Sequence, residues 1–318
     1  MTFNPTQMVN EAVDRTQPYL RQTILDFSPA YSQQTSVDVY FKCENLQHTG
    51  SFKARGALNK ILSLREVERE KGIVTASTGN HGAACAFAMQ QVGASGIVFV
   101  PETAVPTKLD AIRRLGAEIR TFGTDSIETE AHARDFATAN EMTYVPPYND
   151  PFVMAGQGTI GAELLHQLPE PDAVFVSVGG GGLIGGIASY LKAVKPSVQI
   201  IGCSPENSQV MAQSVAAGKL LDLPSLPTLS DGTAGGVEPG SITFPLCRDH
   251  VDQYISVTEA EIATSLREFM ENQHMLIEGS AAVAIAAFLK IANSFQGKRI
   301  AIVLCGANIS LDTLKKIL

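Results

Sequence analysis

Residues 173–193 read AVFVSVGGGGLIGGIASYLKA, and this stretch decides the fold of the chain. Its first six residues are apolar apart from one serine, which is typical of a strand covered on both faces. Four glycines follow, and a helical pattern begins at Leu183. A buried strand that turns through a short glycine run into a helix predicts an open α/β sheet.

The same alternation continues along the rest of the chain. We expect further strands at 37–41, 73–76, 96–100, 118–122, 199–203 and 300–304, and helices at 53–64, 82–92, 107–115, 127–139, 158–167 and 259–272. The turn-rich segments 146–151 and 224–239 mark crossings between parts of the chain. The sequence therefore predicts two lobes with parallel sheets: a large domain of residues 1–69 and 144–318, and a small inserted domain of residues 70–143.

Composition and charge exclude several classes of protein. The chain has 24 basic and 32 acidic side chains, so its net charge of −8 gives no electrostatic reason to bind nucleic acid or an anionic membrane. The N-terminus lacks the apolar run of a signal peptide, and no window is long enough to span a membrane, so we expect a cytoplasmic protein. The five cysteines are widely spaced and form no C-x-x-C pair, which argues against disulfides and against structural zinc.

The glycine run 179–182 also predicts a site for a phosphate group. Glycine lets backbone N–H groups approach a ligand without a Cβ in the way, and the start of a helix adds partial positive charge. A plain turn from strand to helix, the alternative, would need fewer glycines. Because Gly180, Gly182 and Gly185 also match G-x-G-x-x-G, with Glu206 beyond the next strand, an NAD-dependent oxidoreductase stays open as a rival interpretation.

A second segment, KCENLQHTGSFKARGA at residues 42–57, runs from a strand through a turn into a helix. Ser51 is a good N-cap residue, so we expect Lys53 in the first turn of that helix. The partial positive charge of a helix start disfavours the protonated amine and lowers the pKa of Lys53. Such a lysine suits a Schiff base or a general base, although a solvated surface lysine is the commoner interpretation of a lysine taken alone.

Two further segments lie where predicted strands end. TASTGNHGAA at 75–84 places two hydroxyls and exposed N–H groups before a helix, which suits an anion of carboxylate size. Ordinary helix capping by Ser77 or Thr78 is the alternative. CGAN at 305–308 follows the last strand, and open α/β sheets bind ligands at such ends. Cys305 taken alone could equally be a small buried side chain.

Taken together, these segments resemble the fold type II pyridoxal-phosphate enzymes. SFKARGA, STGNHG, the four glycines and CGAN occur in that family's order and spacing, from about Thr23 to about Leu311. The likeness is closest to the group of threonine/serine dehydratases and serine racemases. PPYNDP at 146–151 and AGQGTIG at 155–161 are similar to the catabolic threonine dehydratases. The resemblance implies an α/β fold of two lobes with open, twisted, mostly parallel sheets, as in the β-subunit of tryptophan synthase.

The resemblance further implies that the cofactor is pyridoxal 5′-phosphate. A neutral thiol beside the pyridine nitrogen would leave the ring a weaker electron sink than an aspartate would, which suits β-elimination. The residues implied to bind the cofactor are Lys53, which would carry it, Phe52 against the ring, Asn80 at the phenolic oxygen, Gly179, Gly180, Gly181, Gly182 and Leu183 at the phosphate, and Cys305 at the pyridine nitrogen.

The implied reaction is the dehydration and deamination of L-threonine or L-serine to 2-oxobutyrate or pyruvate, with release of ammonia. Lys53 would take the Cα proton as the catalytic base. Thr78 stands where racemases carry a serine that acts as acid and base on the opposite face. The residues implied to bind the substrate are Ser77, Thr78, Gly79, His81, Tyr148 and Gly235.

Two other activities of the same family stay open: serine racemisation and elimination from threo-3-hydroxyaspartate. The methyl group and restricted χ1 of Thr78 speak against the first. Ile127, at the position of an arginine that would hold a second carboxylate, speaks against the second. The segment 232–240 departs from the family pattern, which leaves an unusual hydroxy amino acid open as substrate. Ser204 and Val210 stand at the racemase positions for divalent-metal ligands, so we expect no metal. A homodimer or homotetramer is the assembly that the family implies.

Overall fold

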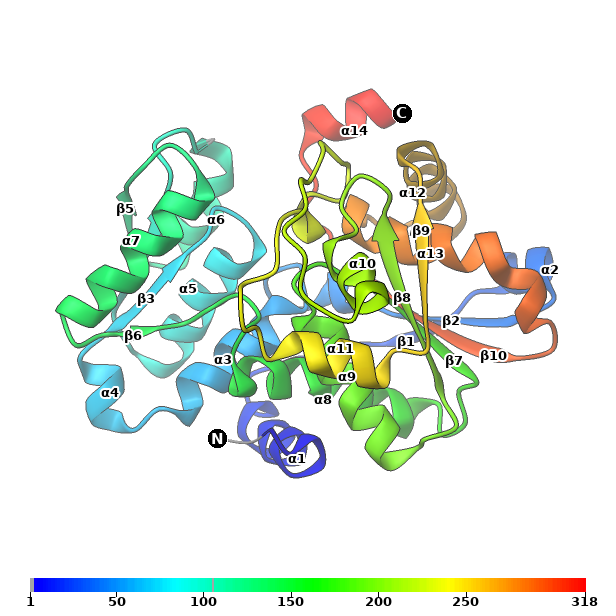
Figure 1. The fold of residues 1–318 in the computed structure, drawn as a ribbon, viewed down its shortest axis with the longest axis horizontal. Coiled ribbons are helices and arrows are strands. Elements are labelled where there is room, and N and C mark those ends of the chain that lie inside the picture. The colour runs from blue at the N-terminus through cyan, green and yellow to red at the C-terminus, as the bar shows by residue number, and fades with distance from the viewer. Residues whose placement is uncertain (1–2, 105) are drawn as a thin grey trace.

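The computed structural model describes residues 3–104 and 106–318, which form two sheets flanked by helices (Figure 1). The strands are β1 (Leu25–Phe27), β2 (Asp38–Lys42), β3 (Ile73–Ala76), β4 (Gly96–Val100), β5 (Glu118–Thr121), β6 (Thr143–Tyr144), β7 (Ala173–Ser177), β8 (Gln199–Pro205), β9 (Gln253–Val257) and β10 (Arg299–Val303). The larger sheet has six strands in the order β1-β2-β10-β7-β8-β9, and the smaller has four in the order β5-β4-β3-β6. Neighbouring strands are parallel except β1 with β2. The predicted α/β fold is confirmed.

Helices connect and cover these strands. Up to the end of the smaller sheet they are α1 (Pro5–Thr16), α2 (Pro29–Thr35), α3 (Lys53–Ser63), α4 (Glu66–Glu70), α5 (Asn80–Val92), α6 (Pro106–Arg114) and α7 (Ser126–Ala139). After it come α8 (Pro151–Gln167), α9 (Gly182–Val194), α10 (Val210–Ala217), α11 (Thr243–His250), α12 (Glu259–Gln273), α13 (Gly279–Ile291) and α14 (Leu311–Ile317). The short 3₁₀ helices are η1 (Glu44–Leu46), η2 (Asp231–Thr233) and η3 (Ala292–Phe295). None of the described helices has the length and apolarity needed to cross a membrane.

Both faces of the smaller sheet are buried at the strands β3 and β4. Alternate residues of a strand point to opposite sides of a sheet. Ile73 and Val98 accordingly pack in one apolar cluster with residues of α5, whereas Val74 and Phe99 pack in another with residues of α7. This two-sided burial explains why β3 and β4 read as nearly continuous apolar runs in the sequence.

The two sheets draw on different parts of the chain. The smaller sheet is built from strands between residues 73 and 144, at the left of Figure 1, and the strands of the larger sheet lie on both sides of that segment in the sequence. We therefore propose that residues 70–143 form an inserted domain and that residues 1–69 and 144–318 form the other domain.

The larger sheet is covered by helices that approach one another closely. Every residue of β7 is buried, and both α9 and α13 pack on that strand. α8 and α9 touch through glycines: a Cβ on Gly158 would lie 3.0 Å from the carbonyl oxygen of Gly186, and one on Gly186 would lie 2.3 Å from that of Met154. Larger side chains at these positions would push the two helices apart.

Some element boundaries differ from the sequence prediction. α8 begins at Pro151 rather than at residue 158, because the Asp150 carboxylate caps it by accepting hydrogen bonds from the N–H groups of Phe152 and Val153. The strands β1, β6 and β9 were not predicted. β1 has three residues and β6 has two, too few for an alternating pattern to be visible.

Candidate active site

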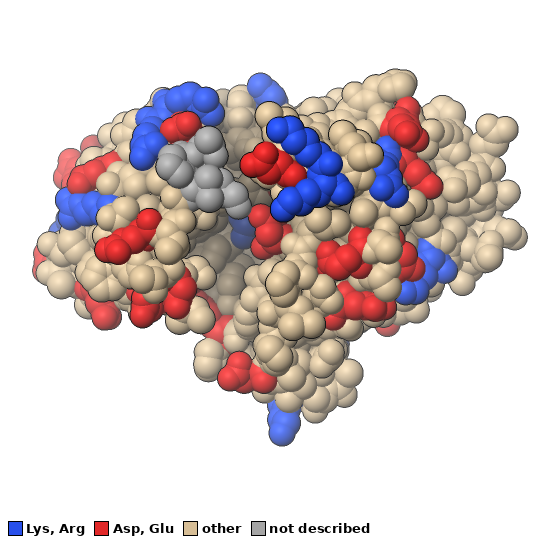
Figure 2. Space-filling view, turned by 90° about the horizontal axis from the view of Figure 1, so that it is seen from above, with Lys and Arg blue, Asp and Glu red and all other residues tan. Residues whose placement is uncertain are grey.

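Three of the four motif segments meet in the structure. Figure 2 shows that the surface of the molecule is hollowed on one face. Asn80 follows β3 and Asn308 follows β10, and Asn308 Nδ2 donates a hydrogen bond of 2.6 Å to Asn80 Oδ1. Ser51, two residues before Lys53, forms an isolated β-bridge with Gly306. The lysine segment, the STGNHG segment and the CGAN segment therefore share one site.

Lys53 is the first residue of α3, but Ser51 does not cap that helix, so the predicted cap is wrong. The N-cap residue is Phe52, and no side chain bonds to the helix start. Ser51 is instead held in the extended bridge with Gly306, and its buried hydroxyl has no hydrogen-bond partner among the described residues. Lys53 Nζ donates a hydrogen bond of 2.8 Å to the carbonyl oxygen of Pro147. Burial lowers the pKa of the Lys53 amine to about 8, although nearby Cys85, Cys305 and Glu278 act in the opposite direction.

The glycine loop 179–182 leads directly into α9. Gly181 has φ of +84°, a left-handed conformation that side chains other than glycine rarely adopt, and it is the N-cap residue of a helix that no side chain caps. A Cβ on Gly180 or Gly182 would lie 2.6 Å from Tyr148 atoms, and one on Gly179 would lie 2.8 Å from the carbonyl oxygen of Thr233. The first N–H groups of α9 are therefore uncapped, and Tyr148 and Thr233 pack closely against the loop.

Neighbouring residues connect this loop to the lysine. Pro147 accepts the hydrogen bond from Lys53 Nζ, and Tyr148, the next residue, packs on Gly180 and Gly182. The lysine and the glycine loop are therefore joined through two consecutive residues of the crossing segment, although they are more than a hundred positions apart in the sequence.

Glu278 belongs to this site and was missed by the sequence analysis. It is 4% exposed and lies at the N-cap of α13. Its carboxylate accepts hydrogen bonds from Asn80 Nδ2 at 3.0 and 3.2 Å, from the Asn308 N–H at 3.2 Å and from Cys305 Sγ at 3.8 Å. Burial raises the pKa of Glu278 to about 7. The signal that could have found it is a single charged residue within the run 275–289, which otherwise contains only one polar side chain, Ser280.

Cys305 lies directly after β10 and is buried beside Glu278. Its side chain is 3% exposed, and burial raises the pKa of the thiol well above its usual value, with further contributions from Glu278. The thiol therefore stays protonated at physiological pH. Its sulfur donates to Glu278 Oε1, so the residue is both a buried side chain and a neighbour of the polar cluster.

The segment from Ser77 to His81 precedes α5. Gly79 is the N-cap residue, no side chain caps the helix, and Ser77 Oγ accepts a hydrogen bond of 3.2 Å from the Gly79 N–H. Thr78 is partly exposed, and nothing lies within 4 Å of a Cβ built on Gly79. His81 is buried, with Nε2 2.9 Å from the Val145 carbonyl oxygen, and burial lowers the pKa of its ring to about 3. The neutral imidazole therefore bonds to the backbone rather than facing open space.

The segment 233–242 lies across the glycine loop and is tied to the smaller sheet's part of the molecule. The Glu238 N–H donates to Tyr148 Oη at 2.9 Å, and Asn149 Nδ2 donates to Glu238 Oε2 at 2.5 Å. Glu238 also forms an ion pair with Arg134 of α7. Gly235, predicted to bind substrate, donates its N–H to Ser225 Oγ at 3.0 Å. These bonds position the segment above the site.

We expect Glu238→Gln to loosen this segment. The substitution keeps the shape but removes the charge that pairs with Arg134, and a partly exposed pair is worth about 1 kcal/mol, or roughly fivefold in a local opening equilibrium. Amide hydrogen exchange of residues 233–242 should then be about fivefold faster than in the wild type. Glu118→Gln, which breaks an exposed pair with Arg120, is the control. Unchanged exchange in Glu238→Gln would show that the ion pair does not hold the segment.

A buried cluster of charges contacts α3 through Arg55. Arg55 is 1% exposed, and its guanidinium donates to Glu44 Oε2 and to Glu163 Oε1, both at 2.7 Å. Lys42, fully buried in β2, reaches Glu163 Oε2 at 2.6 Å. The cluster joins β2, η1, α3 and α8, and it lies two residues from Lys53.

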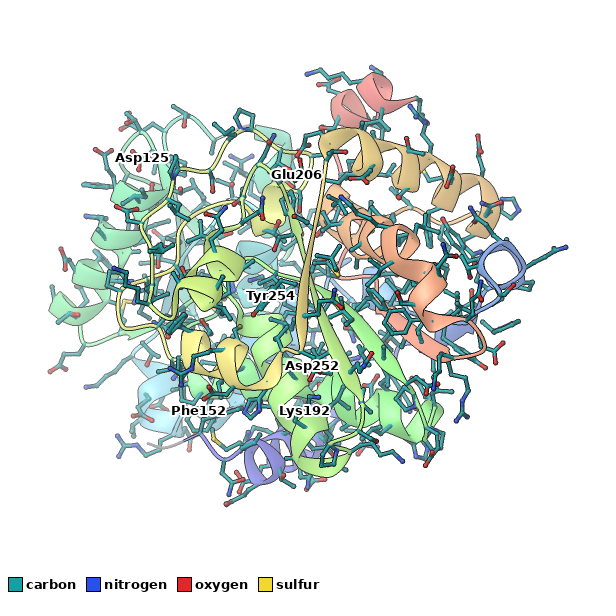
Figure 3. All side chains as sticks on the ribbon, turned by 45° about the vertical axis from the view of Figure 1, so that its right-hand side comes forward. Asp125, Phe152, Lys192, Glu206, Asp252 and Tyr254 are labelled. Carbon is teal, nitrogen blue, oxygen red and sulfur yellow. The ribbon has the colours of Figure 1, made fainter. Side chains whose placement is uncertain are left out.

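Glu206, the acid of the dinucleotide alternative, follows β8 and is exposed (Figure 3). Its N–H donates to the Val257 carbonyl oxygen of β9. The dinucleotide interpretation gives no role to Lys53, Asn80 or the buried Glu278.

Comparisons with known sequences give matches over nearly the whole chain. Residues 16–306 match a family described as pyridoxal-phosphate dependent enzymes. The L-threonine ammonia-lyase of Geobacter sulfurreducens is 40% identical over 311 residues, which cover 98% of this chain and 77% of that protein. The catabolic L-threonine dehydratase of Staphylococcus aureus is 39% identical over 314 residues, which cover 98% of this chain and 90% of that protein.

Solved structures show the same architecture. Maize serine racemase superimposes with a TM-score of 0.93 and 32% identity, covering 99% of this chain and 97% of its own. The processed form of threonine deaminase isoform 2 from Solanum lycopersicum gives a TM-score of 0.92 and 32% identity, covering 98% and 92%. The similarity extends over both sheets and the cleft between them.

Proposed function

This chain belongs to the family of pyridoxal-phosphate dependent enzymes, and we propose that it dehydrates and deaminates L-threonine, L-serine or both. The products would be 2-oxobutyrate or pyruvate, together with ammonia. The observation that carries the proposal is that Lys53 contacts the same short segment that packs on the glycine loop. The relatives at 40% and 39% identity are a threonine ammonia-lyase and a threonine dehydratase, which supports the choice of substrate.

The residues of the site fit pyridoxal phosphate. The first N–H groups of α9 are uncapped, as suits a phosphate site. The loop before them consists of glycines, and a Cβ at any of them would lie within 3.0 Å of neighbouring atoms. The lowered pKa of Lys53 suits a lysine that carries an aldehyde cofactor. We propose that the phosphate is held by Gly179, Gly180, Gly181, Gly182 and Leu183, and the ring by Phe52, Asn80 and Cys305.

The chemistry divides between the cofactor and the chain. When bound, the cofactor withdraws electrons from the substrate Cα and so acidifies its hydrogen. Lys53 is the base that takes this proton, because a pKa of about 8 leaves part of its amine neutral at neutral to weakly alkaline pH. Thr78, partly exposed in the cleft, is the proposed second catalytic residue. The N–H groups at the start of α5, beside Ser77 and Gly79, would hold the substrate carboxylate.

The remaining proposed substrate residues have supporting positions. Tyr148 lies over the glycine loop and bonds to the segment that contains Gly235. The His81 ring bonds to the backbone of Val145, so we propose that it fixes the segment before α5 rather than contacting the carboxylate directly.

Serine racemisation is the second candidate, favoured by the high structural similarity to maize serine racemase. Thr78 stands where racemases carry a serine and would supply a hydroxyl, but its methyl group restricts the rotamers that would bring the hydroxyl to the substrate. Ile127, on α7, is 80% exposed and offers no charge for a second substrate carboxylate, which weighs against hydroxyaspartate.

The test is release of 2-oxo acid by the purified protein loaded with pyridoxal phosphate. L-threonine, L-serine, D-serine and threo-3-hydroxyaspartate would be supplied separately, with and without a chelator. Fast 2-oxobutyrate release from L-threonine, unaffected by chelator, is the expected result. Turnover of hydroxyaspartate or D-serine alone, or interconversion of D- and L-serine without release, would overturn the proposed substrate and reaction.

We also propose that the enzyme acts in the cytoplasm as a homodimer or homotetramer. Light scattering of the purified protein in solution measures the assembly directly. A mass equal to that of the monomer, 33.9 kDa, would contradict the proposed oligomer.

A further inference from the structure

Glu278 is a buried carboxyl group at the start of α13. Glu278 forms no ion pair with any described residue, and its side chain is only 4% exposed. A buried carboxylate without an ion pair is costly unless several donors satisfy its oxygens. Such a group is therefore expected to have a role in the arrangement of its neighbours.

The donors to Glu278 come from both parts of the molecule. Asn80 Nδ2, from the start of α5, donates at 3.0 and 3.2 Å. Cys305 Sγ and the Asn308 N–H, both after β10, donate at 3.8 and 3.2 Å. A Cβ on Gly306 would lie 2.7 Å from the carboxyl atoms, so the group fits closely against the backbone. The Glu278 side chain thus links the segment after β3 of the smaller sheet to the segment after β10 of the larger sheet.

The orientation of the Asn80 amide is fixed by the same cluster. Asn308 Nδ2 donates to Asn80 Oδ1 at 2.6 Å, so the oxygen of that amide faces Asn308 and the nitrogen faces Glu278. This assignment follows from the hydrogen-bond network, since an amide nitrogen can only donate. A flipped amide would place two donors against each other on the Asn308 side. Removal of the Glu278 carboxylate would take away the acceptor that holds Asn80 Nδ2.

The charge on Glu278 changes near neutral pH. Burial and the nearby Asp231 raise the pKa of Glu278 to about 7, while the bonds from Asn80, Asn308 and Cys305 oppose the rise. Lys53 faces the same space and interacts with Glu278 electrostatically. The charge at this end of the site is therefore set by one carboxyl group, one lysine and one acid on η2, together with a neutral thiol.

We propose that Glu278 is a positioning residue of the cofactor site, whose carboxyl group holds Asn80 and Cys305 together. These are the two side chains that would bond to the phenolic oxygen and to the pyridine nitrogen of the cofactor. The inference rests on the proposed function, because it assigns Glu278 a role toward the cofactor. It adds a residue from a segment outside the four motifs.

The first test measures binding of pyridoxal phosphate to cofactor-free protein. Glu278→Ala removes the acceptor and should weaken binding by about tenfold or more, since hydrogen bonds to a charged group contribute about 1.5 to 3 kcal/mol. Glu278→Gln keeps the shape and one oxygen acceptor, so we expect binding within about threefold of wild type. Glu271→Ala, the same change at an exposed glutamate of α12, should bind like the wild type.

The second readout is the absorbance of the bound cofactor between pH 5.5 and 9. The wild type should show an inflection near pH 7 as Glu278 loses its proton, and both Glu278 variants should lack it. Glu278→Gln must first be shown by circular dichroism to fold like the wild type. If Glu278 served only the stability of the fold, the pH profile of this variant would match that of the wild type.

The outcomes distinguish a failure of the proposed function from a failure of the role proposed for Glu278. A wild-type protein that does not bind pyridoxal phosphate would overturn the proposed function and this inference together. A wild type that binds, with Glu278→Ala binding equally tightly and both variants keeping the wild-type pH profile, would overturn the role of Glu278 and leave the proposed function standing.

Discussion

Lys53→Ala should abolish 2-oxo acid release while leaving the protein folded. The variant loses both the amine that would carry the cofactor and the base that would take the Cα proton, and removal of a positioned general base alone costs roughly 10²- to 10⁴-fold. We therefore expect a loss of at least about 10³-fold in kcat/KM for L-threonine. The only hydrogen bond of the Lys53 side chain among the described residues is to Pro147, so the fold should persist.

The control for this variant is Lys71→Ala. Lys71 lies on the surface after α4 and pairs with Glu141, which is also exposed, so its loss should not change the rate. The absorbance of the bound cofactor gives an independent readout, because a protein without Lys53 cannot hold the cofactor by the same bond. Substantial 2-oxo acid release by Lys53→Ala would remove this lysine from the mechanism.

Arg55→Met should be the most destabilising of the substitutions considered. The arginine pairs with Glu44 and Glu163 in the interior, and its removal leaves buried carboxylates with fewer partners. Breaking a buried pair by removing one partner costs about 3 to 5 kcal/mol. Because Lys42 still pairs with Glu163, we expect the free energy of unfolding to fall by about 3 kcal/mol, at the lower end of that range. Urea denaturation measures this loss.

A second variant separates unpaired charge from lost packing. Adding Glu44→Gln to Arg55→Met removes a carboxylate that forms no ion pair with any other described residue, so part of the lost stability should return. Arg120→Met, which removes an exposed arginine that pairs with Glu118, should change stability by less than about 0.5 kcal/mol. An Arg55→Met protein as stable as the wild type would show that the cluster contributes nothing to stability.

Local patterns predicted most of the strands and the glycine loop, because the cause of each is local. β7 is buried along its whole length, so every residue in it has to be apolar or small, and that requirement is visible in the sequence. Gly181 has a positive φ, a backbone requirement that few residues other than glycine satisfy. The family resemblance rests on the same kind of short motif, and the comparisons confirm it.

Local reasoning failed where tertiary contacts determine the backbone. Ser51 has the side chain of a good N-cap, yet the Phe52 N–H donates to the Cys305 carbonyl oxygen, and the Ala307 N–H donates to that of Gly50. This pairing keeps Ser51 extended, and the helix starts after Phe52. No propensity of residues near Ser51 contains this information, because its partners lie about 255 positions away.

The sequence by itself determined the class of fold, the family, and the segments that hold the lysine and the glycine loop. Only the tertiary structure decided which side chains touch. Glu278 has no motif around it, and it becomes part of the site because two sheets bring it to Asn80, 198 residues earlier in the chain. The physical reason is that backbone conformation depends largely on neighbouring residues, whereas the charge and hydrogen bonds of a buried carboxyl group depend on whatever the fold places against it.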